Sequence, residues 1–138
     1  MSQWVEFSFR HFELVTIGVG IIVLLLGLEV YRRIRGSQPL SPMQAVLRMN
    51  RDDIAVLDIR EMHYFAKGHL SGARHVPLAQ LPIYLKKLTT QTPILLVAEQ
   101  GEPPYKINQL LRIQGFKQLY YLEGGVRAWQ QANLPLVQ

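Results

Sequence analysis

The uncharged apolar run from Leu14 to Leu28 limits most strongly what the N-terminal part of this chain can fold into. As an α-helix, the run covers only about 22 Å of the ~30 Å hydrocarbon core of a bilayer. Extending the helix to residues 12–31 gives a spanning length. Glu13 and Glu29 then lie near its two ends, where a carboxylate can reach interfacial water. The sequence therefore predicts a transmembrane helix over residues 12–31.

A buried core helix and a signal peptide both fit the apolar run less well than a membrane anchor does. A helix in the core of a soluble domain has a polar face, and the segment from Ile17 to Leu26 has none. A secretory signal peptide begins with basic residues and ends at a small-residue cleavage site. Here Glu6 and Arg10 precede the run, and Tyr-Arg-Arg-Ile-Arg follows it. We therefore expect a retained single-pass anchor.

The charges on either side of the run predict its orientation. The N-terminal side carries one Arg and two Glu, whereas Arg32, Arg33 and Arg35 follow the run. Positively charged flanks stay on the cytoplasmic side of a membrane. We therefore predict an extracytoplasmic tail over residues 1–11, a basic juxtamembrane linker over residues 32–39 and a cytoplasmic domain over residues 40–138.

Composition excludes several kinds of chemistry. The chain has no cysteine, so it can form no disulfide, thiolate nucleophile or thiolate metal site. Its formal net charge is +5, but part of this excess is the cluster of three arginines after the apolar run. The remaining Lys and Arg are scattered among Asp and Glu, whereas a nucleic-acid site needs a contiguous basic face. We predict no nucleic-acid partner.

The C-terminal part alternates between helix and strand patterns. Ser41, Pro42 and Gln44 form a capping box that opens a helix. Three apolar runs predict strands at residues 54–59, 94–98 and 119–122, and the first two are continuous, as expected for strands covered on both faces. Helices are predicted over residues 82–88, 104–114 and 126–132. This alternation predicts an α/β fold with a parallel sheet between helices.

The loop after the second of these strands has an unusual composition. In α/β proteins, the end of a parallel strand that leads into a helix is a common site of catalysis or anion binding. This loop, Ala98 to Pro104, contains no Ser, Thr, Cys, His or Lys. It therefore has the position of a catalytic loop without a nucleophile.

Three groups of residues resemble signatures of the rhodanese-like family. The first comprises Asp58-Ile59-Arg60, Gly68-His69-Leu70 and Gly72. The second comprises the strand at residues 94–98, the loop with Gly101, and a helix that ends at Gly115-Phe116. The third comprises Glu123-Gly124-Gly125 and Trp129. Because they occur in family order, the chain resembles a small membrane-anchored, single-domain rhodanese-like protein of bacteria. The resemblance implies a three-layer rhodanese-like domain. The anchor lies outside the resemblance, and we expect it in the bacterial inner membrane.

The resemblance also implies which reaction this chain has lost. In active members of the family, a cysteine three residues before the loop glycine carries sulfur as a persulfide, and loop N–H groups cradle its charge. The matching position here is Ala98, whose methyl group cannot carry sulfur. Pro103 and Pro104 have no N–H to donate. Glu99 and Glu102 add negative charge that opposes an anion.

The other motif residues are expected to be structural. Asp58 and Arg60 tie a strand end to a loop by hydrogen bonds, and His69 bonds to the backbone of its turn. The glycines of Glu123-Gly124-Gly125 form a tight turn, and Trp129 packs in the core. The three histidines at positions 63, 69 and 75 have neither helical nor zinc-site spacing, so we predict no metal and no cofactor.

These observations favour a binding module over an enzyme. The leading hypothesis is a membrane-tethered, inactive rhodanese-like domain whose partner is an unidentified membrane or membrane-associated protein. Its candidate binding loop comprises Ala98, Glu99, Gln100, Gly101, Glu102, Pro103, Pro104 and Tyr105. One alternative is a sulfurtransferase, which needs a nucleophile from a partner. Another is a sensor of small anions at the helix N-terminus near Tyr105, which the two carboxylates oppose.

Overall fold

The computed structural model describes residues 2–51 and 53–138, without the side chains at positions 2, 8, 9 and 33–35. The side chains of Arg33 and Arg35, on which the predicted orientation partly depends, therefore lie outside the described residues. The chain divides into two compact units, residues 1–34 and 35–138. Each unit is described by itself.

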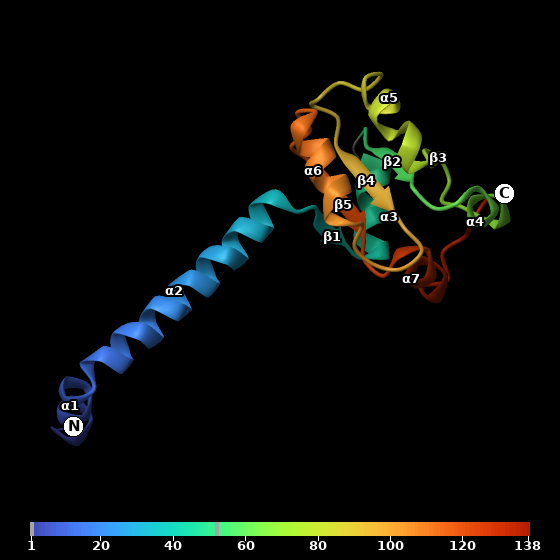
Figure 1. Cartoon of the computed structure of the whole chain (residues 1–138). Coiled ribbons are helices and arrows are strands. Elements are labelled where there is room, and N and C mark those ends of the chain that lie inside the picture. The colour runs from blue at the N-terminus through green and yellow to red at the C-terminus, as the bar shows by residue number, and fades with distance from the viewer. Residues whose placement is uncertain (1, 52) are drawn as a thin grey trace. The chain divides into compact units, whose positions relative to one another are not determined.

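The N-terminal unit consists of two helices, α1 (Ser2–Arg10) and α2 (Phe12–Arg35), joined at His11 (Figure 1). Residues 12–32 of α2 form a helix that is long and apolar enough to cross a membrane, and no residue of its apolar window is buried. This length and composition fit a membrane anchor and also a signal sequence. Helix α1 was not predicted from the sequence, where these residues were expected to form a tail.

The C-terminal unit is a parallel five-stranded sheet with the strand order β1-β5-β4-β2-β3. The sheet strands are β1 (Gln38–Leu40), β2 (Ala55–Asp58), β3 (Arg74–His75), β4 (Ile94–Val97) and β5 (Leu119–Leu122). The helices are α3 (Pro42–Arg51), α4 (Met62–Lys67), α5 (Leu81–Leu85), α6 (Tyr105–Ile113) and α7 (Gly125–Gln131), with a 3-10 turn, η1 (Leu78–Gln80), before α5. The predicted α/β fold with a parallel sheet is confirmed.

Two apolar clusters pack against the opposite faces of the sheet. Alternate residues of central strand β4 face opposite sides, as a strand requires. Ile94 and Leu96 pack in the cluster that includes α5 and α6. Leu95 and Val97 pack in the cluster that includes α3 and α7. All four are fully buried, which explains why this strand is a continuous apolar run.

Local sequence signals set the start of α3. The Oε1 atom of Gln44 accepts from the N–H of Ser41 at 3.0 Å, and the Ser41 hydroxyl accepts from the N–H of Gln44 at 3.3 Å. This is the predicted capping box. In contrast, α5 is shorter than predicted. Beyond Leu85, the N–H groups of Lys87 and Leu88 bond three residues back, so the chain tightens into turns.

Strand β1 lies in the segment that was predicted to be a linker. Gln38 pairs with Tyr120 and Leu40 with Leu122 at one edge of the sheet. Pro39 is compatible with this position, because an edge strand leaves one side without partners. The short elements α4 and β3 were also missed, since six and two residues are too few for a periodic pattern.

Candidate functional site

The loop Ala98–Pro104 lies at the carboxyl edge of the sheet, between β4 and α6. Because β4 pairs in parallel with β2 and β5, the segments that follow these three strands meet at that edge. The N–H of Ile59 donates to the carbonyl of Val97 at 3.1 Å, so the residues after β2 start beside the loop. The sheet topology therefore brings Arg60, Ala98 and the Glu123–Gly125 turn to one place.

The start of the loop is held against the N-terminus of α7. The N–H of Val126 donates to the carbonyl of Ala98 at 3.1 Å. Gly125 has a φ of 63°, and a Cβ there would lie 2.5 Å from the Ala98 oxygen and 2.4 Å from the Glu99 oxygen. Only glycine allows this approach. The loop thus keeps a fixed path although Ala98 carries no reactive group.

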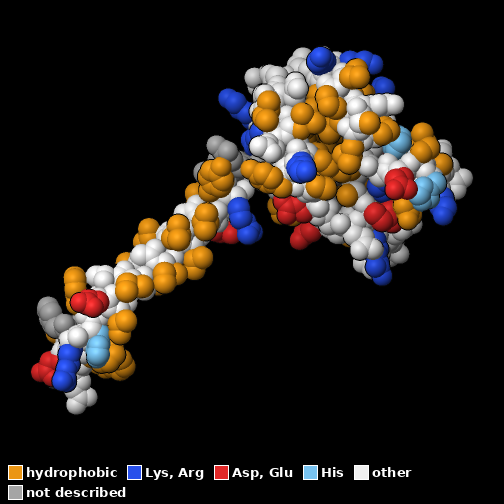
Figure 2. Space-filling view, viewed as in Figure 1, with side chains coloured by type: hydrophobic (Ala, Val, Ile, Leu, Met, Phe, Trp, Pro, Cys, Tyr) orange, Lys and Arg blue, Asp and Glu red, His pale blue; other side chains and the backbone are white. Residues whose placement is uncertain are grey.

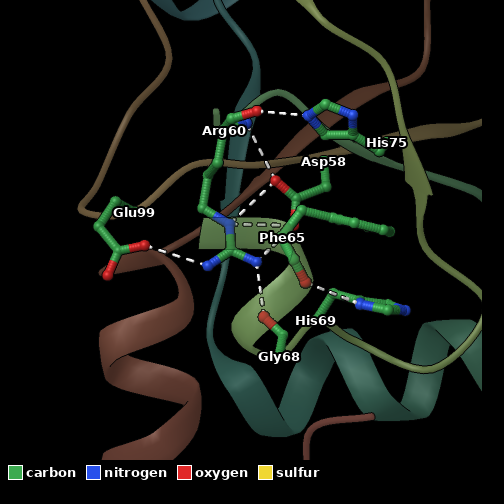
Figure 3. A network of polar contacts seen from close by, with 7 residues as sticks. All are labelled: Asp58, Arg60, Phe65, Gly68, His69, His75 and Glu99. Atoms are coloured by element: carbon green, nitrogen blue, oxygen red, sulfur yellow. Dashed lines mark hydrogen bonds and ion pairs between the residues drawn. The ribbon is translucent and has the colours of Figure 1, made fainter. Parts of the chain in front are cut away.

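The buried guanidinium of Arg60 ties the segments after β2 and β4 together through ion pairs with Asp58 and Glu99 (Figure 3). The Nε of Arg60 donates to both carboxylate oxygens of Asp58 at 3.0 Å, and Nη2 donates to Oδ2 at 2.7 Å. Nη2 also donates to the carbonyl of Gly68 at 2.8 Å, and Nη1 donates to Oε2 of Glu99 at 3.1 Å. Each guanidinium nitrogen therefore already has an oxygen partner within the chain.

The environment of Arg60 keeps it charged. Burial alone would lower the pKa of this guanidinium. Hydrogen bonds and charge from Asp58, and then from Glu99, outweigh burial and raise the pKa above its ordinary value. The carboxylate of Glu99, which has a side-chain exposure of 46%, is thus an internal counter-ion at the mouth of the site.

Two histidines near this network are bonded to backbone carbonyls. The Nδ1 of His69 donates to the carbonyl of Phe65 at 3.1 Å, and the Nε2 of His75 donates to the carbonyl of Arg60 at 2.6 Å (Figure 3). Both rings pack on Phe65, with centroid distances of 3.9 and 5.0 Å. Exposed His63 pairs instead with Glu61 at 3.3 Å. Within residues 2–51 and 53–138, no group of three His, Asp or Glu is arranged to hold a metal.

A hollow of about 150 Å³ opens beside this network. Its lining residues are Arg60, Tyr64, Lys67, Gly68, Glu99, Val126, Gln130 and Leu136. Tyr64, Gln130 and Leu136 were not predicted from the sequence. Tyr64 comes from the short helix α4, and Leu136 is brought in by an antiparallel bridge between His69 and Val137. Local sequence patterns cannot predict such a bridge, because His69 and Val137 are far apart in the chain.

The rest of the loop is mostly exposed and acidic. Glu99, Gln100 and Glu102 are exposed, Pro103 is buried, and Tyr105 has a relative exposure of 57%. No Ser, Thr or Cys lies in residues 98–105. The site therefore offers carboxylates, an amide and the phenol of Tyr105 for contacts, and residues 98–105 offer no Ser or Thr hydroxyl and no thiol.

The other motif residues lie where their structural roles require. The backbone at Gly124 has a φ of 72°, and a Cβ there would lie 2.5 Å from the Cβ of Ala128. Trp129 is 4% exposed, and its Nε1 donates to the carbonyl of Pro135 at 3.0 Å. Gly72 has a φ of 79° in an exposed turn. These residues shape the frame around the loop.

Comparisons with known proteins agree with this geometry. Residues 41–132 match the family described as Rhodanese-like domain. A thiosulfate sulfurtransferase from Stutzerimonas stutzeri is 30% identical over 64% of this chain and 82% of its own length. An uncharacterized protein from Buchnera aphidicola is 27% identical over 99% of this chain and 97% of its own length. The rhodanese-like domain of an Anabaena protein superimposes with a TM-score of 0.64 at 23% identity, over 73% of this chain and 79% of that one.

The buried ion pair generates a first prediction. Replacing Arg60 by Met leaves the carboxylate of Asp58 buried without its partner, which costs about 3–5 kcal/mol of unfolding free energy. Glu99→Gln removes only a half-exposed partner and should cost about 1 kcal/mol or less. Denaturant unfolding of the two variants in detergent, followed by circular dichroism, measures the difference. Equal losses would contradict the ranking.

The glycine contact generates a second prediction. Gly125→Ala should destabilise the domain more than Gly72→Ala. Both positions have positive φ, which costs an alanine about 1–2 kcal/mol, but only Gly125 meets backbone atoms within 2.6 Å. Gly72 has nothing within 4 Å, so it is the matched control. Thermal unfolding midpoints of the two variants test this, and a smaller shift for Gly125→Ala would refute the steric argument.

Tyr121 generates a third prediction, on pH. Burial, and then the charges of Glu102 and Glu123, raise the pKa of this phenol above 10.0. The folded state thus holds its proton longer than the unfolded state, and this contribution to stability is lost as the pH rises through the folded pKa. Glu102→Gln should lower that pKa. Ultraviolet titration, with Tyr121→Phe subtracted, measures it, and an unchanged pKa would contradict the proximity of Glu102.

Proposed function

Since the chain belongs to the rhodanese-like domain family, we propose that it is an inactive member that binds a protein partner at the cytoplasmic face of the bacterial inner membrane. One observation carries the proposal: the loop is fixed in place, yet it has no nucleophile. The chain contains no cysteine, and the resemblance places the family's sulfur carrier at Ala98. Maintaining a loop path without its reaction favours a role in recognition.

The electrostatics of the loop also argue against an anionic substrate. Arg60 is the buried cation nearest the loop, and its Nη1 is already paired with Glu99. An incoming anion must displace that carboxylate. Pro103 and Pro104 also provide no N–H groups to a cradle. Exposed Glu99, Gln100, Glu102 and Tyr105 instead provide polar and aromatic contacts of the kind found at protein interfaces.

The anchor fits this proposal. Helix α2 supplies one apolar span, and the arginines at the C-terminal end of this helix favour a cytoplasmic domain with the N-terminus outside. A single-pass tether confines the domain to the layer next to the membrane. Such confinement raises its effective concentration for other membrane proteins without adding any contact. We therefore propose a membrane protein, or a protein bound to one, as the partner.

A second candidate function is sulfur transfer, which the name of the Stutzerimonas relative favours. In this chain it requires a thiol supplied by another molecule. The purified protein, incubated with thiosulfate and cyanide, should then form no thiocyanate above a mock preparation. Turnover by the isolated chain would refute both the inactive binding module and the need for a thiol from another molecule.

Crosslinking in cells tests the binding module. A photoreactive residue in place of Gln100 should trap a specific protein, whereas the same group in place of exposed Gln91, before β4, should not. Combining Glu99→Gln and Glu102→Gln with the probe at position 100 should reduce the yield about fivefold or more, as expected when interface contacts are lost. Equal yields at positions 100 and 91, or no effect of the substitutions, would refute the loop as the binding surface.

A further inference from the structure

The amino ends of the parallel strands lie on one side of the domain, called here the amino edge, and their carboxyl ends lie on the opposite side with the loop Ala98–Pro104, called here the loop edge. The chain coming from the anchor reaches the amino edge first. Four exposed acidic residues, Glu61, Glu99, Glu102 and Glu123, follow the carboxyl ends of strands. In Figure 2, the Asp and Glu on the visible face of the domain gather along its lower edge, whereas Lys and Arg lie along its upper rim and also at several other places, including the lower edge. Exposed carboxylates are therefore concentrated at the loop edge of the sheet.

The amino edge begins where the chain leaves α2. Gly36 directly follows the last residue of α2, and its carbonyl accepts from Nη2 of Arg112 at 3.1 Å. Nη1 of the same side chain donates to the carbonyl of Lys117 at 3.0 Å. The end of α6 and the start of β5 are thus held beside the first residues of the domain.

The amino edge continues from the start of β5 to the start of β4 and to the loop after α5. The N–H of Ile94 donates to the carbonyl of Gln118 at 2.9 Å, which places the start of β4 next to the start of β5. A Cβ on Gly115 would lie 3.1 Å from the side chain of Thr90, so the loop after α5 also reaches this edge. Lys86 and Lys87 at the end of α5 are exposed there.

The exposed side chains of the amino edge suit a lipid surface. Lys86, Lys87 and Lys117 are exposed cations. Asp53 is an exposed acid at this edge, and it lines a hollow together with Arg74 and Lys87. Ile113, at the end of α6, has a relative exposure of 74%, the largest among the exposed large hydrophobic residues described between positions 35 and 138. Exposed cations and an exposed apolar side chain on one edge of a domain are typical of surfaces that bind anionic headgroups.

We propose that the amino edge of the sheet binds the anionic headgroups of the membrane that holds the anchor. Lys86, Lys87 and Lys117 contact the headgroups, and Ile113 enters the interfacial layer. The loop Ala98–Tyr105, at the other edge, then faces away from the lipid and stays open to a partner. This inference rests on the proposed membrane anchor, but it does not depend on which molecule the loop binds.

The absence of cysteine allows a direct test with the full chain in nanodiscs. Gln118→Cys and Gln100→Cys place one label at the amino edge and one at the loop edge, both at exposed glutamines. A quencher attached to lipid headgroups should quench the label at position 118 at least about threefold more than at position 100 when phosphatidylglycerol is present. The difference should shrink in phosphatidylcholine alone and in about 0.5 M salt.

Charge substitutions distinguish docking of the amino edge on the membrane from a non-specific electrostatic attraction of the domain to anionic lipid. Lys86→Gln, Lys87→Gln and Lys117→Gln together should lower quenching at position 118. The control variant carries Lys67→Gln, Lys106→Gln and Arg127→Gln, which remove three charges from exposed positions on α4, α6 and α7 nearer the loop edge. This variant should not lower quenching at position 118. Equal quenching at positions 118 and 100, or equal effects of the two variants, would overturn the proposal. Failure of the chain to enter nanodiscs would overturn the anchor, whereas failed crosslinking at position 100 would overturn only the binding loop.

Discussion

The arrangement of the loop edge depends on the buried charge of Arg60. A guanidinium with 5% of its side chain exposed must find oxygen partners, because an unpaired buried charge is severely destabilising. Its partners come from the end of β2, from the turn at Gly68 and from Glu99, which lies 39 residues away along the chain. One side chain thus fixes the relative positions of segments that are distant in sequence.

In this fold, the path of the loop does not depend on the side chain that carries out the family's reaction. Helix α7 holds the Ala98 carbonyl, and Gly125 lets the loop pass close to the helix, whatever side chain position 98 carries. The position can therefore lose a nucleophile without loss of the loop path. A loop that is already ordered loses little conformational entropy when it binds, which suits a recognition surface.

A parallel sheet has two unlike edges, and this chain is attached near one of them. All strands run in the same direction, so loops that follow strands collect at one edge and loops that precede them at the other. Because β1 is the first strand after α2, the chain enters the domain at the amino edge. The topology thus leaves the carboxyl edge, with its acidic loop, available for a different partner.

The sequence by itself determined the features that neighbouring residues control. These are the apolar span, the capping box of α3, the buried strands β2 and β4, and the absence of any thiol. Tertiary structure alone decided the rest. It placed Pro39 in an edge strand, paired Glu99 with Arg60, and brought Tyr64 and Leu136 to one hollow. The physical reason is range: caps and apolar runs act within a few residues, whereas these contacts join residues that become neighbours only when the sheet forms.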